Sequence, residues 1–159
     1  MTSDNPLVEM LIRHEGVVKL NGRHVPYDDA SGARLDSGDT VVGKITLGIG
    51  RNIQEVGITD DEAMLLLTND LERVRCELNQ ALPWWITLSE ARRAVLVSMV
   101  FNMGLAGFLK FKTTIGHIEH GEYVQAADAM LDSKWAKQVG PRATELAEMM
   151  RSGKWKMDA

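Results

Sequence analysis

Two short stretches of this 159-residue chain carry acidic side chains at positions that could serve chemistry. Glu15 ends a predicted helix, where the helix macrodipole favours basic rather than acidic side chains. Asp28 and Asp29 lie in a turn that opens a long predicted hairpin loop, and Thr46 lies on the strand after that loop. A solvated or salt-bridged Glu15 is the simpler alternative, because exposed glutamates are common near helix ends.

Two carboxylates that face each other across a cleft can hydrolyse a glycosidic bond. One carboxyl group must be protonated to donate to the leaving oxygen, and the other must be ionised to organise a nucleophile. Burial against apolar groups favours the protonated form, whereas hydrogen bonds favour the ionised form. Glu15 and Asp29 are therefore candidates for acid–base chemistry on a sugar.

Other chemistries have less support in the sequence. His117 and His120 are three residues apart, but no visible set of carboxylate or cysteine partners accompanies them, so we expect no metal site. Cys76 is the only cysteine and lies in a predicted helix, which favours an inert thiol. The segment 48–50 lacks the third glycine and the following helix of a phosphate-binding loop, so it does not indicate a phosphate site.

Composition and charge restrict the function classes. Hydrophobic residues make up 45% and charged residues 25%, as in ordinary soluble globular proteins, and the length fits one domain over 1–159. With 22 acidic and 18 basic residues the net charge is −4, which argues against nucleic-acid binding. The most apolar run, 94–107, is too short to span a bilayer, so we expect no stable membrane insertion. The polar, acidic start does not resemble a signal peptide.

The first third of the chain predicts one helix followed by a small sheet. Apolar spacing predicts a helix over 6–14. Between 17 and 53, glycines fall among Val, Ile and Thr residues, with turn residues at 28–32 and 37–39. This pattern is typical of a small antiparallel sheet with one long hairpin loop.

The rest of the chain predicts helices. Thr59-Asp60-Asp61-Glu62 matches a capping box that opens a helix over 60–80. A second box, Thr87-Leu88-Ser89-Glu90, opens a helix to about Met103 that Gly104 should stop. The stretch 94–101 is apolar on nearly all sides and should lie at the centre of the core. Shorter helices are expected at about 112–120, 122–132 and 142–152.

These elements predict an α+β, mainly helical fold with two lobes. A small β-rich lobe should occupy 16–57, a long connecting helix 58–80, and a helical lobe 81–159, packed with the N-terminal helix 6–15. A cleft between unequal lobes is a common place for a substrate.

Several blocks in order along nearly the whole chain resemble the phage-type lysozymes of glycoside hydrolase family 24, which includes the T-even phage lysozyme type. The matching blocks are Glu15-Gly16, Tyr27-Asp28-Asp29, Thr46-Leu47-Gly48-Ile49-Gly50, Met99-Val100-Phe101-Asn102-Met103-Gly104, Ser133-Lys134-Trp135, Pro141-Arg142-Ala143 and Arg151-Ser152-Gly153-Lys154-Trp155. The resemblance implies the lysozyme-like two-lobe fold.

The resemblance also implies roles for individual residues. Glu15 would be the general acid, and Asp29 the carboxylate that positions water or stabilises an oxocarbenium-like state. Thr46 would help to hold that water. Arg142 would pair with Glu15, and Asn102 would contact the substrate.

The predicted hairpin departs from the family pattern. Thirteen residues (16–28) separate Glu15 from Asp29, and sixteen (30–45) separate Asp29 from Thr46, both longer than in the family's short form. Asp29 is favoured as the second carboxylate because it stands two residues after Tyr27 and precedes Ala-Ser-Gly. Asp28 and Asp39 remain competing positions.

The function that the resemblance implies is hydrolysis of the β-1,4 bond between N-acetylmuramic acid and N-acetylglucosamine in peptidoglycan. Family members usually invert the anomeric centre and need no cofactor or metal. The chain would act as a monomeric phage or prophage endolysin, held in the host cytoplasm until a holin-type lesion admits it to the cell wall. A lytic transglycosylase and a non-catalytic peptidoglycan-binding module are the alternatives. The net charge of −4 predicts weaker attraction to anionic cell wall than strongly basic relatives have.

Overall fold

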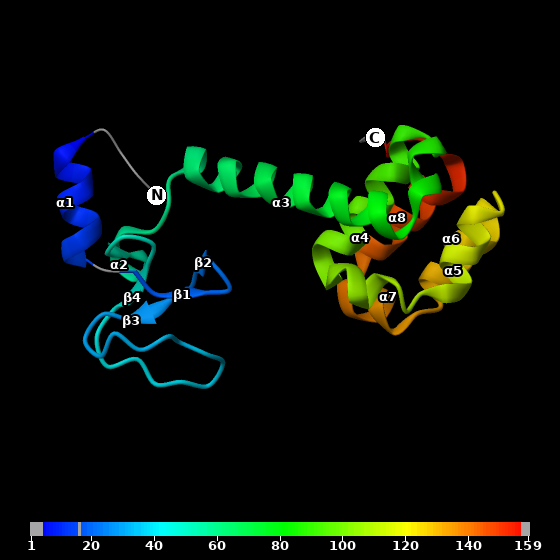
Figure 1. The fold of residues 1–159 in the computed structure, drawn as a ribbon. Helices are drawn as coiled ribbons and strands as arrows, with labels where there is room; N and C mark the ends of the chain where they lie inside the picture. Colours follow the sequence, from blue (N-terminus) through cyan, green and yellow to red (C-terminus); the bar gives the residue numbers. More distant parts are fainter. Residues whose placement is uncertain (1–4, 16, 157–159) are drawn as a thin grey trace. The chain divides into compact units, whose positions relative to one another are not determined.

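The computed structural model describes residues 5–15 and 17–156 (Figure 1). The chain divides into two compact units, Met1–Ala63 and Met64–Ala159. Gly16, which was expected to follow the first helix, and residues 1–4, on which the expectation about a signal peptide partly rests, lie outside the described residues.

In its described residues, the first unit holds two helices before the start of α3 (Asp60–Ala81) and two small antiparallel sheets, in agreement with the α+β prediction. Its elements are α1 (Pro6–Glu15), β1 (Lys19–Leu20), β2 (Arg23–His24), β3 (Tyr27–Asp28), β4 (Ile45–Leu47), β5 (Arg51–Asn52) and α2 (Ile53–Val56). Strands β1 and β2 pair through a two-residue turn, Asn21-Gly22, in which both residues have positive φ, as tight hairpins require. The second sheet has the order β3-β4-β5.

The predicted long hairpin loop connects β3 to β4. Tyr27 pairs with Thr46 and Asp28 with Ile45, so residues 29–44 form the loop. The loop folds back along the other edge of β3, where the Leu35 N–H donates to the Pro26 carbonyl at 3.0 Å. Strand β3 is therefore enclosed between β4 and the loop's own backbone.

The first predicted capping box forms at the start of α3 (Asp60–Ala81). The Glu62 N–H donates to the Thr59 hydroxyl at 3.3 Å, and the Thr59 N–H donates to the Glu62 carboxylate at 2.8 Å. The second bond and the ion pair with Arg51 lower the pKa of Glu62. The reciprocal bonds satisfy two amides that the first helical turn leaves without partners.

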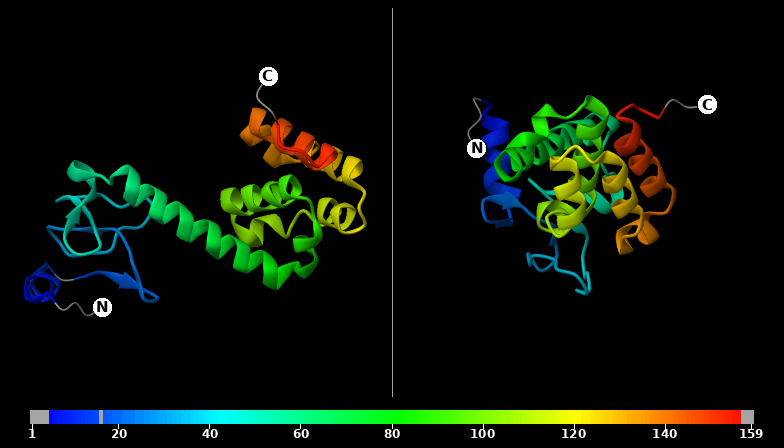
Figure 2. Two further views of the ribbon diagram at one scale, coloured as in Figure 1. Left: turned by 90° about the horizontal axis from the view of Figure 1, so that it is seen from above. Right: turned by 90° about the vertical axis from the view of Figure 1, so that its right-hand side faces the viewer.

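The second unit is helical. After the end of α3 it contains a short 3₁₀ helix, η1 (Pro83–Thr87), and then α4 (Glu90–Phe108), α5 (Lys112–Glu119), α6 (Tyr123–Leu131), α7 (Lys134–Val139) and α8 (Pro141–Ser152). Helix α6 packs against α5 and α8, and α4 also packs against α8 (Figure 2). Among the described residues, no single helix is long and apolar enough to cross a bilayer.

Helix α4 supplies the centre of the core, as its sequence predicts. Val95, Leu96, Met99 and Val100 are at most 1% exposed. Phe101 is an exception at 44% exposure, so the apolar stretch is not buried on every side. Burying side chains from several turns of one helix in this way supplies the main stabilising contribution to such a unit.

Two predictions about α4 were wrong in detail. Its N-cap is Ser89, whose hydroxyl accepts from the Arg92 N–H, while Thr87 ends η1 and donates to the Trp84 carbonyl. Gly104 does not stop the helix but breaks it, with φ 74° and ψ 160°, and helical structure resumes to Phe108. Because glycine readily adopts positive φ, the chain can kink there and continue.

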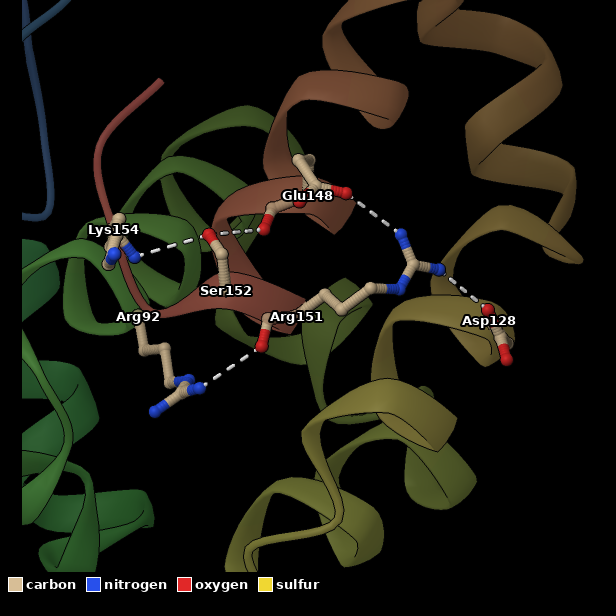
Figure 3. Close-up of polar contacts among 6 residues, drawn as sticks. All are labelled: Arg92, Asp128, Glu148, Arg151, Ser152 and Lys154. Carbon is tan, nitrogen blue, oxygen red and sulfur yellow. Dashed lines mark hydrogen bonds and ion pairs between the residues drawn. The ribbon is translucent and has the colours of Figure 1, made fainter. Parts of the chain in front are cut away.

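The C-terminus of α8 is held by side chains from other helices (Figure 3). Arg92 donates to the carbonyls of Met150 and Arg151 at 2.8 and 3.2 Å, and its guanidinium lies 3.4 Å from the ring centroid of Tyr123. Arg151 in turn pairs with Asp128 at 2.7 Å. These contacts tie α4, α6 and α8 together.

Candidate active site

The predicted site residues are divided between the two units. Glu15, Asp29 and Thr46 lie in the first unit, and Asn102 and Arg142 lie in the second. The base of the β3–β4 hairpin brings Asp29 and Thr46 together, with Asp28 beside them.

Asp28 and Asp29 are neighbours with opposite environments. Asp28 is 2% exposed, and its Oδ1 accepts hydrogen bonds from the N–H groups of Ala30 and Gly43 at 2.9 and 3.0 Å. Its Oδ2 accepts from the Val42 N–H at 2.6 Å. These bonds, the one from Val42 foremost, lower the pKa of Asp28 against the opposing effect of desolvation. Asp28 is thus an ionised group with both oxygens engaged by the backbone.

Asp29 is exposed, and one of its oxygens is fixed. Oδ1 accepts from the backbone N–H of Lys44 at 2.6 Å, while the backbone N–H of Asp29 donates to the Lys44 carbonyl at 3.1 Å. Within the described residues, Oδ2 makes no hydrogen bond. A carboxylate oriented through one oxygen and open to solvent at the other can accept a proton from water or face a developing positive charge. The geometry therefore favours Asp29 over Asp28 for such chemistry.

Thr46 lies opposite Tyr27 on β4 and is 3% exposed. Its hydroxyl donates to the Lys44 carbonyl at 3.3 Å, so the oxygen keeps lone pairs for a further donor. Lys44 therefore contacts both predicted residues through its backbone. Its ammonium pairs with Glu55, whose hydrogen bond raises the pKa of Lys44. Sequence reasoning missed Lys44, because any residue type can make these hydrogen bonds with its backbone, so the sequence contains no signal for them.

Glu15 is the last residue of α1 and its side chain lies against the β4–β5 turn. A Cβ on Gly50 would stand 2.5 Å from Oε2 and 2.9 Å from Cδ of Glu15. Gly50 also has φ +66°, which disfavours other residues. The described residues offer Glu15 no hydrogen bond or ion pair, and its side chain is exposed. The turn that Glu15 contacts follows the strand that carries Thr46.

In the second unit, Asn102 and Arg142 already have partners. The indole N–H of Trp135 donates to Oδ1 of Asn102 at 2.9 Å, which leaves the Asn102 amide group for other acceptors. Arg142 donates to the hydroxyl and the carbonyl of Ser98 at 2.8 and 3.2 Å. The pairing of Arg142 with Glu15 stays a prediction, as does a substrate contact of Asn102.

The histidine pair also has partners that the sequence did not indicate. Nδ1 of His117 lies 2.5 Å from a carboxylate oxygen of Glu122, and Nδ1 of His120 lies 2.7 Å from the Gly116 carbonyl. In the described part of the chain, no three His, Cys, Asp or Glu residues form a group that could hold a metal ion.

Comparison with known proteins adds independent information. The model of the family described as phage lysozyme matches residues 28–151. The chain is 27% identical over 172 aligned residues to the pre-baseplate central spike protein Gp5 of Enterobacteria phage T4, covering 96% of this chain and 29% of that protein. It is 29% identical over 99 residues to the probable T4-type lysozyme 1 of Dictyostelium discoideum, covering 60% of this chain and 58% of that protein. The chain thus spans less than two thirds of either relative.

Proposed function

Since the chain belongs to the phage lysozyme family, we propose that it is a muramidase that hydrolyses the β-1,4 bond between N-acetylmuramic acid and N-acetylglucosamine in peptidoglycan. The observation that carries the proposal is the family match over residues 28–151, which includes the hairpin with Asp29 and Thr46. The chemistry of that hairpin agrees with it, because an exposed carboxylate and a hydroxyl that are both fixed on the Lys44 backbone suit the handling of water.

In the proposed mechanism, Glu15 donates a proton to the bridging sugar oxygen as the glycosidic bond breaks. Asp29 uses its solvent-facing Oδ2 to accept a proton from an attacking water, and the hydroxyl of Thr46 helps to orient that water. Attack on the face opposite the leaving group inverts the anomeric centre. The reaction as proposed needs the two carboxyl groups and water and no cofactor.

Product analysis tests the proposal and separates it from its alternatives. The purified chain is incubated with peptidoglycan in ¹⁸O-labelled water, and the released muropeptides are analysed by mass spectrometry. Hydrolysis predicts reducing muramic acid ends that each carry one ¹⁸O atom. Anhydro ends that lack one water would show a lytic transglycosylase instead. Binding to peptidoglycan without any released product would show a non-catalytic module.

A further inference from the structure

The proposed mechanism leaves one buried ionised group without a role. Asp28 is the one acidic side chain among the buried residues of the described chain, at 2% exposure. A carboxylate withdrawn from water is costly unless hydrogen bonds compensate it. Its position directly before Asp29 calls for an explanation beyond turn formation.

The donors to Asp28 come from both ends of the hairpin loop. Ala30 follows it by two residues, whereas Val42 and Gly43 follow by 14 and 15 residues. One carboxylate therefore holds the outgoing and the returning chain together. Hydrogen bonds to an ionised acceptor are stronger than those between neutral groups, so this contact is well suited to restrict the returning backbone.

The same returning backbone holds Asp29. The N–H groups of Val42 and Gly43 donate to Asp28, and the next N–H, that of Lys44, donates to Asp29. Gly43 permits this arrangement, because a Cβ there would stand 2.1 Å from Oδ1 of Asp29. Three consecutive amides thus serve two consecutive carboxylates.

We propose that Asp28 is a positioning residue, whose carboxylate anchors the segment 42–44 and thereby holds the carboxylate of Asp29 in its reactive orientation. This inference rests on the proposed muramidase function. Asp28 does not touch the reacting atoms, because backbone donors occupy both of its oxygens. Asp28 acts through the N–H of Lys44. Its loss should affect the reaction only by changing the position of the Asp29 carboxylate.

The substitution Asp28→Asn tests the anchor with little change of volume. If the amide oxygen of the substituted side chain keeps the two bonds at Oδ1, its NH₂ group must face the Val42 N–H. Both of these groups are donors, so the hydrogen bond from Val42 is lost. We expect kcat on soluble peptidoglycan fragments to fall about 10- to 100-fold, the usual effect of misplacing a catalytic group by about 1 Å. KM should change by less than about twofold, since bound substrate does not contact Asp28. Asp36→Asn is the matched control, an exposed carboxylate in the same loop that pairs with Arg34, and it should leave kcat unchanged.

A double variant separates positioning from a general structural role. If Asp28 acts through Asp29, then adding Asp28→Asn to Asp29→Asn should cost no further activity, because the group to be positioned is already disabled. Multiplying losses would overturn the proposal. If Asp28→Asn fails to fold, Asp28→Glu replaces it, because the longer side chain keeps the negative charge but must shift the N–H groups of Val42 and Gly43 that the shorter carboxylate holds; its loss must also vanish on the Asp29→Asn background.

Carbon-13 NMR of the Asp29 carboxyl group and amide exchange at Lys44 provide a readout that does not depend on activity. Both should change in Asp28→Asn and stay constant in Asp36→Asn, measured well below the unfolding temperature. An unchanged Asp29 signal would overturn the positioning role even if the chain proves to be a muramidase. A wild-type chain that cleaves no peptidoglycan would instead refute the proposed function. The NMR comparison would still test whether Asp28 holds Asp29 in place.

Discussion

Asp29 and Thr46 are linked through a single backbone unit, because Lys44 donates its N–H to Oδ1 of Asp29 at 2.6 Å and accepts from the hydroxyl of Thr46 at 3.3 Å. The two residues proposed to handle water are therefore positioned by the same peptide segment. The N–H of Lys44 holds Asp29 and its carbonyl holds Thr46, so different atoms of the segment position the two side chains. The side chain of Lys44 points to a different partner, Glu55, and is not needed for this link.

The substitutions Lys44→Ala and Lys44→Pro should therefore differ sharply. Lys44→Ala keeps the backbone N–H and loses only an exposed ion pair, and such pairs contribute little to stability. We expect activity within about threefold of wild type. Lys44→Pro removes the donor to Asp29 and should lower kcat at least about 100-fold. Turnover of peptidoglycan measures both, and circular dichroism confirms that each variant is folded. Equal activity of the two variants would contradict the backbone link.

The hairpin base should loosen in acid before the helical unit does. Hydrogen bonds from Val42 and its neighbours hold the pKa of Asp28 below its ordinary value. A group with a lowered folded-state pKa stabilises the fold fully above its unfolded pKa of about 4, and this stabilisation is lost as the pH falls through the folded-state pKa. Glu62 at the start of α3 adds a contribution of the same sign, since the bond from the Thr59 N–H lowers its pKa.

Amide signals of Val42 and Gly43 followed by NMR between pH 7 and pH 2 check this expectation. They should broaden or shift below about pH 4, while core amides of α4 such as that of Val95 stay constant. Asp28→Asn should remove the transition at Val42, because the titrating anchor is gone. A transition that persists in this variant would assign the acid sensitivity to other groups.

The contact of Arg92 with the end of α8 should stabilise the helical unit without touching the chemistry. Its guanidinium donates to two terminal carbonyls and stacks on Tyr123, and Gly153 leaves it room, since a Cβ there would stand 2.8 Å from Cζ. Arg92→Met should lower the free energy of unfolding by about 2 kcal/mol. Gly153→Ala should cost about 1 kcal/mol or more, because it also forces alanine to φ +70°.

Denaturant unfolding of both variants measures these losses. The double variant should be more stable than the sum of the single effects predicts, because the clash at position 153 disappears when the guanidinium is removed. Arg73→Met is the control, an exposed arginine on α3 whose ion pairs among the described residues are with Asp70 and Glu77 on its own helix. Peptidoglycan cleavage well below the unfolding temperature should stay near wild type in all of them.

Sequence patterns predicted the elements that depend on nearby residues, through apolar periodicity, helix caps and turn residues. The apolar spacing and the capping box located α3 to within one residue, and the glycine-rich segment predicted the antiparallel hairpin. Short elements escaped prediction, among them α2 and α7, because four to six residues hold too little periodicity to be recognised. Ser89 was overlooked as the cap of α4 because Thr87, two residues earlier, also fits the pattern with Glu90.

The residues of the candidate site stay predictions, and the structure adds the backbone hydrogen bonds that hold two of them, Asp29 and Thr46. The Tyr-x-Asp spacing favoured Asp29, and the hydrogen bonds of Asp28 and Asp29 point the same way. The contributions of Gly43 and Lys44 could not be predicted, because they arise from backbone amides brought together by a loop closure of about fifteen residues. The pairing of Arg142 with Glu15, which the resemblance implies, stays a prediction, and within the helical unit Arg142 donates to Ser98.

Glu15 and Gly50 can be tested together. Glu15 carries the proton in the proposed mechanism, and Gly50 leaves room for the Glu15 carboxylate because it has no Cβ. Glu15→Gln keeps the shape but removes the acid, and it should lower turnover of peptidoglycan at least about 100-fold without changing the free energy of unfolding. Glu119→Gln, an exposed glutamate at the end of α5, is the control and should be fully active.

Gly50→Ala leaves the acid in place but adds a Cβ 2.5 Å from its carboxylate oxygen, at a φ of +66°. The side chain of Glu15 must then move, so kcat should fall about 10- to 100-fold. On the Glu15→Gln background, Gly50→Ala should cause no further loss of activity, although it should still destabilise the fold. A Gly50→Ala variant with full activity would show that the contact between Glu15 and the β4–β5 turn has no part in the reaction, and an active Glu15→Gln would remove Glu15 from the mechanism altogether.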